Sequence, residues 1–489
     1  MPEKIVKQSE DFARWYTDVV QQAALADYAP VKGCMVIRPY GYAIWERVQA
    51  GLDKMIKDTG HENAYFPLFI PESFMKKEAE HVEGFAPECA VVTHGGGQKL
   101  EEPLYIRPTS ETIIWSMASK WIQSHRDLPF LINQWANIVR WEMRPRLFLR
   151  TTEFLWQEGH TAHATEQEAI DETMKMLGVY KEFAEKHLAV YVLAGQKTES
   201  EKFAGAARTY SIEAMMKDRK ALQAGTSHFF GQNFAKAFNV QFQDEKGQLQ
   251  HVHTSSWGVS SRLIGAMVMV HGDDNGLVVP PRIAPIQVVV VPIWRKDDEK
   301  VAVLEATGRL QKEIGEKVRV KVDAREQYSP GWKFNEWELK GVPIRVEIGP
   351  KDVAKNQVVI VRRDLPSPAE AGYAKAGTKK KDFVPQAGLA ERVTALLDEI
   401  QANLLATSKK FTEEHSFVVD SYDEFKKQME AESGFLYSHW CGAATCEVKI
   451  KEDTKATARC IPLDAKKESG KCIVCGADSE QRVIFAKAY

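Results

Sequence analysis

Hydrophobic and polar positions in the second half of the chain follow two alternating periods. A run of β-branched residues at 286–293 predicts a buried strand, because strands covered on both faces are apolar throughout. Positions 301–314 then show the 3.6-residue period of an amphipathic helix. The pattern continues with a strand at 318–322, a helix at 331–340, and strands at 342–348 and 357–361. Strands alternating with helices predict one compact α/β unit over 286–405.

The first half contains a predicted hairpin. Positions 128–139 alternate and lead into Arg140-Trp-Glu142, and alternation resumes over 150–160 after a basic loop. Because side chains two apart on a strand share a face, Arg140 and Glu142 are expected to point the same way. Antiparallel pairing would gather four polar or aromatic side chains: Arg140, Arg150, Trp156 and Glu158. The alternative is a surface hairpin with ordinary ion pairs.

Changes in composition divide the chain into three parts. Gly and Asp residues at 272–276 and prolines at 279–285 predict a turn and an extended connector. Five cysteines crowd into 441–475. At about 150 residues per domain, a chain of 489 residues allows roughly three domains. We therefore expect domains at 1–285, 286–405 and 406–489.

Charge and hydropathy narrow the class of protein. The net charge of −2 argues against a uniformly basic nucleic-acid-binding protein but does not exclude a local basic patch. The run Lys379-Lys-Lys381 fits either a solvated loop or a contact with phosphates. No apolar run reaches the roughly 18 residues of a membrane span, and the chain start lacks the apolar segment of a signal peptide. We expect a cytoplasmic protein without membrane contact.

The cysteines near the end of the chain have the spacing of a metal site. Four residues separate Cys441 from Cys446, and two separate Cys472 from Cys475. Two such pairs predict a closed, tetrahedral, structural zinc site. The alternative is a small core that holds reduced thiols. Two rival ligands stand outside the paired spacing: Cys460 and His439.

Several segments together carry a family resemblance. Positions 140–160 resemble motif 2 of a class II aminoacyl-tRNA synthetase, and more narrowly of prolyl-tRNA synthetase. Positions 33–71 are similar to motif 1 and positions 256–265 to motif 3. The family's proline-pocket signature resembles 106–112, and its later pocket and ATP loop resemble 222–228. These motifs occur in the family's order, and the resemblance covers nearly the whole chain.

The resemblance implies a fold class and an activity. The fold is α/β and multidomain, with a class II antiparallel sheet flanked by helices, an α/β anticodon-binding domain and a small α+β zinc-binding C-terminal domain. The implied reaction activates proline with ATP and Mg²⁺ to prolyl-adenylate and then transfers the prolyl group to the tRNA for proline. Motif 1 implies a homodimer.

The implied amino-acid pocket suits the chemistry of proline. Oxygens of Glu111 and Thr109 can accept hydrogen bonds from its secondary ammonium, while an arginine takes its carboxylate. Taken alone, Thr109-Ser-Glu111 also fits a helix N-cap, His228 fits an ordinary core histidine, and the aromatic residues fit a core. The resemblance assigns the proline pocket to Thr109, Glu111, Arg140, Trp156, Glu158, Phe203 and His228.

ATP is assigned to a second, overlapping set of residues. Arg140 and Arg262 are the implied catalytic pair, because arginine charge that faces the α-phosphate stabilises the transition state. The reaction needs no nucleophile from the protein. The resemblance assigns ATP to Arg140, Glu142, Arg150, Gln223, Thr226, Ser260 and Arg262.

The remaining implications concern tRNA and the chain end. Glu338, Arg345 and Lys351 are the expected anticodon readers, because Arg and Lys match guanine acceptors and Glu matches its donors; the alternative is a strand with exposed charges. The cysteine-bearing tail resembles that of the archaeal and eukaryotic type of the family, which holds zinc with four cysteines and ends in a tyrosine whose carboxylate points toward the active site, here Tyr489. No large editing insertion separates motifs 2 and 3, so misactivation of alanine or cysteine is expected.

Two other functions remain open at this level. One is a synthetase for another small amino acid such as threonine, and the other is a catalytically silent tRNA-binding paralogue. The pocket segments 109–111 and 225–228 argue against the first. The presence of Arg140, Glu142 and Arg262 argues against the second.

Overall fold

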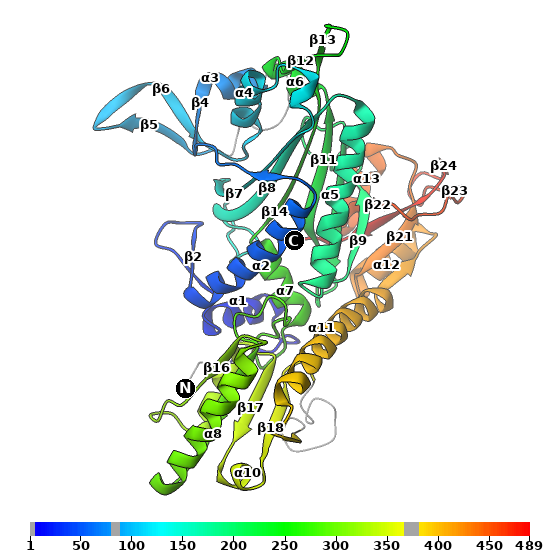
Figure 1. Ribbon diagram of the computed structural model, residues 1–489. Coiled ribbons are helices and arrows are strands. Elements are labelled where there is room, and N and C mark those ends of the chain that lie inside the picture. Colours follow the sequence, from blue (N-terminus) through cyan, green and yellow to red (C-terminus); the bar gives the residue numbers. More distant parts are fainter. Residues whose placement is uncertain (1–4, 80–88, 366–380) are drawn as a thin grey trace.

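A computed structural model describes residues 5–79, 89–365 and 381–489, so Lys379 and Lys380 of the lysine run lie outside the described residues. One long sheet crosses the molecule (Figure 1). Its strands, in spatial order, are β20 (Ser416–Val418), β21 (Phe435–His439), β25 (Arg482–Ala486), β22 (Thr457–Pro462), β9 (Val192–Gln196), β10 (Arg208–Met215), β11 (Ala221–Gly231), β14 (His253–Ser260), β8 (Glu153–His163), β7 (Phe130–Val139) and β3 (Glu62–Asn63). Neighbours are antiparallel except at the two ends, where β20–β21 and β3–β7 are parallel.

The predicted hairpin forms from β7 and β8, with Phe130 opposite Ala162 and Val139 opposite Glu153. One detail of the prediction is wrong: β7 ends at Val139, so Arg140 and Glu142 lie in the loop rather than on a strand. The backbone N–H of Arg140 still donates to the carbonyl of Thr152 at 2.8 Å. This bond holds the start of the loop against the start of β8.

Helices cover the sheet because their apolar faces have nowhere else to be buried. Helix α5 (Glu166–Lys186) begins with a capping box formed by Thr165 and Glu168 and lies along the middle strands (Figure 1). Helix α7 (Arg262–His271) is apolar all round and is buried at nearly every position after Arg262. Both helices contribute to the largest hydrophobic cluster, which also contains Trp15 and Trp45.

The rest of the first 285 residues packs around this sheet. A three-stranded sheet, β4-β6-β5, projects from one end of the molecule (Figure 1). The elements are α1 (Phe12–Gln22), β1 (Ala26–Tyr28), β2 (Met35–Ile37), α2 (Pro39–Asp58), β4 (Phe69–Pro71), α3 (Glu72–Ala79), β5 (Val91–Gly95), β6 (Gln98–Ile106), α4 (Glu111–Trp121), η1 (His125–Asp127), α6 (Asn233–Phe238), β12 (Gln241–Gln243) and β13 (Leu249–His251).

A separate five-stranded sheet follows position 286, as the hydrophobic pattern predicts. Its order is β16-β15-β17-β18-β19, with β15 parallel to both β16 and β17 and the remaining pairs antiparallel. The apolar run becomes β15, whose residues are all buried. The elements are β15 (Val288–Pro292), α8 (Asp297–Gly315), β16 (Val320–Val322), α9 (Pro330–Leu339), β17 (Ile344–Ile348), α10 (Pro350–Ala354), β18 (Gln357–Arg362) and β19 (Asp382–Pro385).

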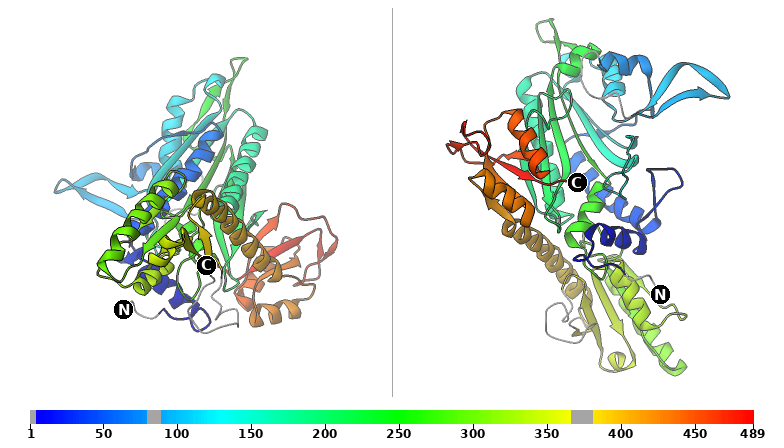
Figure 2. Two further views of the ribbon diagram at one scale, coloured as in Figure 1. Left: turned by 60° about the horizontal axis from the view of Figure 1, so that its bottom comes forward. Right: turned by 180° about the vertical axis from the view of Figure 1, so that it is seen from behind.

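Helix α11 (Leu389–Glu414) runs without interruption past position 405 and connects this unit to the end of the chain (Figure 2). The last elements are α12 (Tyr422–Ala431), α13 (Ala444–Thr454), β23 (Gly470–Lys471) and β24 (Asp478–Ser479). Strand β22 pairs with β9, so the C-terminal strands extend the central sheet. No helix among the described residues is both long and apolar enough to cross a membrane.

Buried ion pairs stabilise the place where β22 joins the central sheet. Glu213 on β10 accepts from Lys197 at 2.7 Å and from the Arg459 guanidinium at 2.9 Å. All three side chains are at least nine-tenths buried. Burial opposes ionisation of Glu213, but the charges of Lys197 and Arg459 hold its pKa below the ordinary value. Removal of one partner would leave an uncompensated buried charge.

Candidate functional site

A cavity opens over the middle of the central sheet, above β8, β11 and β14. Its lining comes from those strands, from β10 and the segment before it, from the starts of α4 and α7, and from the loop after β7. The structure brings together all seven residues predicted for the amino-acid pocket: Thr109, Glu111, Arg140, Trp156, Glu158, Phe203 and His228. They come from five separate parts of the sequence, and pairing of the strands places them around one space.

The polar floor of the cavity is the start of helix α4. Glu111 is the first residue of the helix and is buried, and its carboxylate accepts hydrogen bonds from the hydroxyls of Thr109 and, at 3.4 Å, Ser256. Ser110 occupies the N-cap position, but its side chain donates to Glu158 and makes no capping bond. The helix does begin at the predicted N-cap segment, but the side chain at the N-cap makes no capping hydrogen bond.

Glu158 anchors that helix start. Its carboxylate accepts from the backbone N–H of Ser110 at 3.2 Å and from Gln134 Nε2 at 2.8 Å, and it pairs with His160 Nε2 at 3.1 Å. Together with the Ser110 hydroxyl, these donors occupy both carboxylate oxygens. Glu158 lines the cavity and also fixes the backbone that presents Glu111.

One wall of the cavity is aromatic. The rings of Phe203 and His228 lie with their centroids 4.6 Å apart. The Thr209 hydroxyl lies 3.0 Å from His228 Nδ1. Burial, reinforced by the charges of His160 and Arg140, lowers the pKa of His228 to about 3, so the ring is neutral at ordinary pH. His228 is thus a hydrogen-bonded buried histidine that also lines the cavity.

Arg140 also lines this cavity. Its Nε donates to the carbonyl of Pro108 at 2.9 Å, and its Cζ lies 5.6 Å from the centre of the Trp156 ring. That distance is within the range of a cation–π interaction. The backbone bond and the ring together orient the planar guanidinium, which suits it to bind carboxylate or phosphate oxygens in pairs.

A second cavity adjoins the first. Arg140, Ser260 and Arg262 line both, while Glu142 and Arg150 line the second and Gln223 and Thr226 line the first. Arg262 is half-buried at the start of α7, and its Nε donates to the carbonyl of Leu149 at 3.1 Å. Burial, together with the charges of Arg140 and Arg150, lowers the pKa of Arg262 to about 10, so it stays charged near neutral pH. The nearby arginines make this region attractive to phosphates.

Sequence reasoning missed several residues of the lining, among them Phe154, His160 and Ser256. A signal for two of them was present. Phe154, Trp156, Glu158 and His160 are spaced by two along β8, and residues so spaced on a strand share a face. Ser256 carries no such signal, since only the pairing of β14 with β8 places it opposite His160.

The second candidate region lies on the five-stranded sheet. Glu338 and Arg345 line a small pocket with Trp337, Arg362 and Arg363, whereas Lys351 lies in α10 and does not line it. The guanidinium of Arg345 lies 4.2 Å from the centre of the Phe334 ring and pairs with the buried Glu347 at 3.0 Å. The other two arginines are paired with carboxylates as well, Arg362 with Asp364 at 2.8 Å and Arg363 with Asp273 at 2.5 Å.

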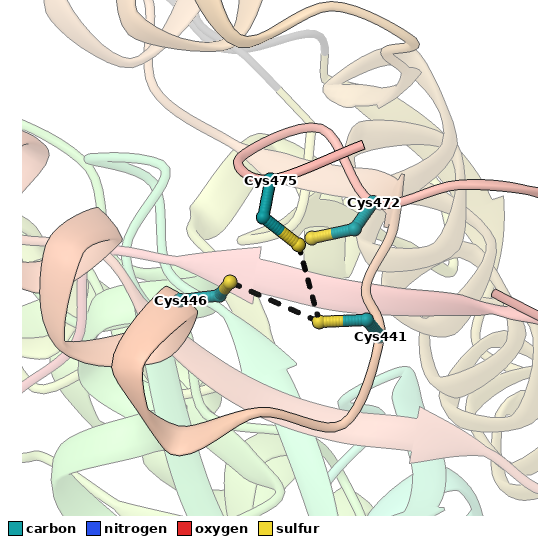
Figure 3. Close-up of side chains that lie close together, drawn as sticks. All are labelled: Cys441, Cys446, Cys472 and Cys475. Carbon is teal, nitrogen blue, oxygen red and sulfur yellow. Dashed lines mark hydrogen bonds between the residues drawn. The ribbon is translucent and has the colours of Figure 1, made fainter. Parts of the chain in front are cut away.

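The four paired cysteines converge (Figure 3). The sulfur of Cys441 lies 3.8 Å from that of Cys446 and 3.6 Å from that of Cys475, and all four sulfurs lie within 4.8 Å of one another. A disulfide needs about 2.05 Å. Tetrahedral zinc with bonds of about 2.3 Å separates its sulfurs by about 3.8 Å. The group therefore fits a metal ion.

The local backbone explains how the thiols converge. Gly442 and Gly476 follow Cys441 and Cys475 with φ of 87° and 74°, a left-handed conformation in which a side chain would be strained. Burial opposes ionisation of Cys472, but backbone N–H groups of Cys475 and Val474 lower its pKa to about 7. A thiolate is the form that binds metal.

The two rival ligands lie elsewhere. Cys460 is buried in a hydrophobic cluster away from the four cysteines and packs against Gly195 of β9. His439 Nδ1 lies 3.1 Å from the Ser479 hydroxyl, and its Nε2 lies 3.6 Å from Glu468. Neither belongs to the convergent group in the part of the chain that the structure describes.

Tyr489 ends the chain in a basic pocket beside the second cavity. Arg150 lines both spaces. The Tyr489 hydroxyl donates to Asp218 at 2.6 Å, and its ring lies 5.5 Å from the Arg146 guanidinium and 5.2 Å from the Lys220 ammonium. These contacts dock Tyr489 against the rest of the protein.

Comparison with known proteins agrees with this architecture. The family model "tRNA synthetase class II core domain (G, H, P, S and T)" matches residues 92–271, "Anticodon binding domain" matches 287–370, and "Prolyl-tRNA synthetase, C-terminal" matches 422–489. The fold and site thus define a class II aminoacyl-tRNA synthetase core.

Individual relatives narrow the family. The proline–tRNA ligases of Chloroherpeton thalassium and Roseiflexus sp. strain RS-1 are 57% and 58% identical to the chain, which they match over 100% of its length and over 100% and 99% of theirs. The prolyl-tRNA synthetase of Cryptosporidium parvum, solved with halofuginone and AMPPNP, superposes with a TM-score of 0.91 at 40% identity over 99% of both chains. The chain belongs to the prolyl-tRNA synthetase family.

Proposed function

We propose that this chain is a proline–tRNA ligase that joins proline to ATP in one step and to tRNA in the next. A carboxylate oxygen of proline attacks the α-phosphorus of ATP, and pyrophosphate leaves. A hydroxyl of the terminal tRNA ribose then attacks the prolyl carbonyl, and AMP leaves. The observation that carries the proposal is the pair of adjoining cavities that share Arg140 and Arg262.

The first cavity would hold proline. Its ammonium would donate to Glu111 and Thr109, which lie together at the start of α4. Its apolar ring would lie among Trp156, Phe203 and His228. Glu158 would contribute by holding Ser110, because its oxygens are already occupied.

The second cavity would hold ATP as its Mg²⁺ complex, which enters as substrate. Arg140 and Arg262 would face the α-phosphate, and Arg150 would face the outer phosphates. Glu142 would contact adenine and Ser260 would hold ATP from the other side, while Gln223 and Thr226 would reach the nucleotide from the adjoining first cavity. Preorganised arginine charge costs no rearrangement at the moment of attack and so stabilises the developing phosphorane.

The other parts of the chain would serve tRNA and stability. Glu338 and Arg345 would read anticodon guanines from their shared pocket, with Lys351 contacting the tRNA from α10. Cys441, Cys446, Cys472 and Cys475 would hold a structural Zn²⁺. The three parts of the chain, divided at positions 285 and 405, would then differ in function. Position 405 is not a structural break, because helix α11 runs through it.

We infer a cytoplasmic homodimer that uses the motif 1 region as its interface. Large apolar side chains there are exposed, among them Val36 at 50%, Tyr65 at 74% and Phe69 at 44%. Large apolar side chains left exposed in one region of a chain favour a protein–protein contact there.

Amino-acid-dependent exchange of pyrophosphate into ATP tests the function. We expect exchange with proline and far less with threonine. Exchange with threonine alone would favour a synthetase for another amino acid, and no exchange with any amino acid would favour a silent paralogue. Family membership and the arginine pair do not favour either alternative.

A further inference from the structure

His160 is a titratable side chain of the first cavity that the proposed reaction does not use. Its side chain is 1% exposed, and Nε2 lies 3.1 Å from the Glu158 carboxylate. Ligand atoms of His160, Glu111 and Glu158 lie within 4.8 Å of one another. The ring of Trp115 packs against His160 with centroids 6.2 Å apart.

Two buried carboxylates this close need a compensating positive charge. Glu158 on its own strand and Glu111 on α4 act directly on His160. The other charged or titratable groups that line the cavity are His228 on β11, Arg140 after β7, Glu201 before β10 and Arg262 on α7. His228 is neutral, and Arg140 is directed to Pro108 and Trp156. This leaves His160 as the cation best placed between the two carboxylates.

The balance of forces on His160 agrees with that geometry. Burial disfavours the charged ring, but the hydrogen bond to Glu158 and the charges of Glu111 and Glu158 raise its pKa above the ordinary value. The Nδ1 atom has no hydrogen-bond partner among the described residues. Since Glu158 holds Nε2, the proton on Nδ1 is the one that can leave.

We propose that His160 holds a proton in the empty pocket and releases it to solvent when the ammonium of proline binds beside Glu111. The inference rests on the proposed function. The substrate ammonium brings a second cation to the same pair of carboxylates and takes over their compensation, so the imidazolium loses its advantage. One N–H bond of the ring breaks, its electron pair stays on Nδ1, and the proton goes to water.

The coupling between proline binding and proton release determines how the affinity for proline changes with pH. Because binding releases a proton, proline binds more tightly as pH rises through the pKa of His160 in the empty pocket. The KM for proline should fall by up to about tenfold per pH unit in that window, whereas the KM for ATP should stay nearly constant.

Calorimetry of proline binding to the full-length, zinc-loaded protein tests the proposal. Titrations near pH 7 in two buffers of different ionisation enthalpy give the number of protons released per proline. We expect the wild type to release a proton, at most one per proline, His160→Gln to release nearly none, and His163→Gln to release the wild-type number. His163 is a matched control, because it lies on the same strand, is buried, and has its pKa lowered by burial to about 4.

Absence of proton release in the wild type, or equal release from His160→Gln, would overturn the proposal. If His160→Gln does not fold, the wild-type pH profile decides: a KM for proline that is flat between about pH 6 and 8 overturns it, and one that falls with pH supports it. Proline-dependent pyrophosphate exchange is measured alongside. If the wild type exchanges pyrophosphate but releases no proton, only this inference is refuted. If the wild type shows no proline-dependent exchange, the proposed function is refuted.

Discussion

The guanidinium of Arg140 lies 5.6 Å above the Trp156 ring, and its Nε donates to the Pro108 carbonyl. Trp156 belongs to a central strand, and Pro108 precedes the helix that carries Glu111. Arg140 is thus held between two rigid elements although it stands in a loop. This arrangement fixes a cation where the two cavities meet.

Arg140→Ala should lower proline-dependent exchange by about 10²- to 10³-fold, because one preorganised donor to the developing charge is lost. Arg140→Lys should recover only part of the loss, since lysine keeps the charge but not the planar fork. Arg126→Ala, an exposed arginine of η1, is the control. Exchange at the wild-type rate in Arg140→Ala would remove Arg140 from the site.

Cys472→Ser should reduce bound zinc from about one ion per chain to nearly none and lower the melting temperature, because a structural metal stabilises the fold that binds it. Cys34→Ser is the control, since Cys34 lies outside the convergent group. Elemental analysis and thermal unfolding measure both effects. Unchanged zinc content in Cys472→Ser would refute the ligand set.

Arg345→Ala should lower kcat/KM for tRNA charging by roughly ten- to a hundredfold, the range of one bidentate base contact. Pyrophosphate exchange should be unaffected, because the pocket lies on the separate five-stranded sheet. Arg392→Ala, on the exposed face of α11, should leave both rates unchanged. Equal losses in exchange and charging would point to a folding defect instead.

Alanine should be activated in the exchange assay and remain on tRNA. The residues between β8 and β14 form α5, further strands of the central sheet, α6 and the small β12–β13 hairpin. This segment contains no inserted editing domain, and a pocket alone discriminates against a smaller apolar side chain by only about 10- to 200-fold. Rapid clearance of alanyl-tRNA by the purified protein would contradict this expectation.

Acid should destabilise the protein through its buried neutral histidines. Burial lowers the pKa of His61, His163 and His271 to about 4, and that of His228 to about 3. The unfolded chain therefore binds more protons, and stability falls as pH drops from about 6.5 toward 4. Each such histidine contributes up to about 1.4 kcal/mol per pH unit.

His271→Gln isolates one of these groups. The amide can keep a bond to the Leu188 carbonyl, which lies 2.9 Å from the His271 ring, while the titration is removed. Melting temperatures measured between pH 7 and 5 should fall less steeply for this variant than for the wild type. An identical pH dependence would show that His271 already titrates normally.

The sequence predicts local structure well where one period dominates. The valines of β15 and the amphipathic positions of α8 are examples. It fails at Arg140, because the end of β7 depends on the loop that folds back to Thr152 rather than on alternation. It also gives no sign that β22 joins β9, a pairing between residues more than 260 positions apart.

The candidate site follows a similar rule. Residues in the family's motifs meet as expected, because strand pairing brings β8, β11 and β14 side by side. His160 was missed although it follows Trp156 and Glu158 at a spacing of two. Its importance comes from Glu111 on a distant helix, which only the three-dimensional structure places nearby.

The central proposal is that Arg140 and Arg262, which line both cavities, bind the phosphate between them. Its most direct test is a crystal structure with a non-hydrolysable analogue of prolyl-adenylate. We expect the prolyl ring among Trp156, Phe203 and His228, its nitrogen at Glu111, and its phosphate analogue in contact with Arg140 and Arg262. An analogue bound elsewhere, or bound here without contact to either arginine, would contradict the account.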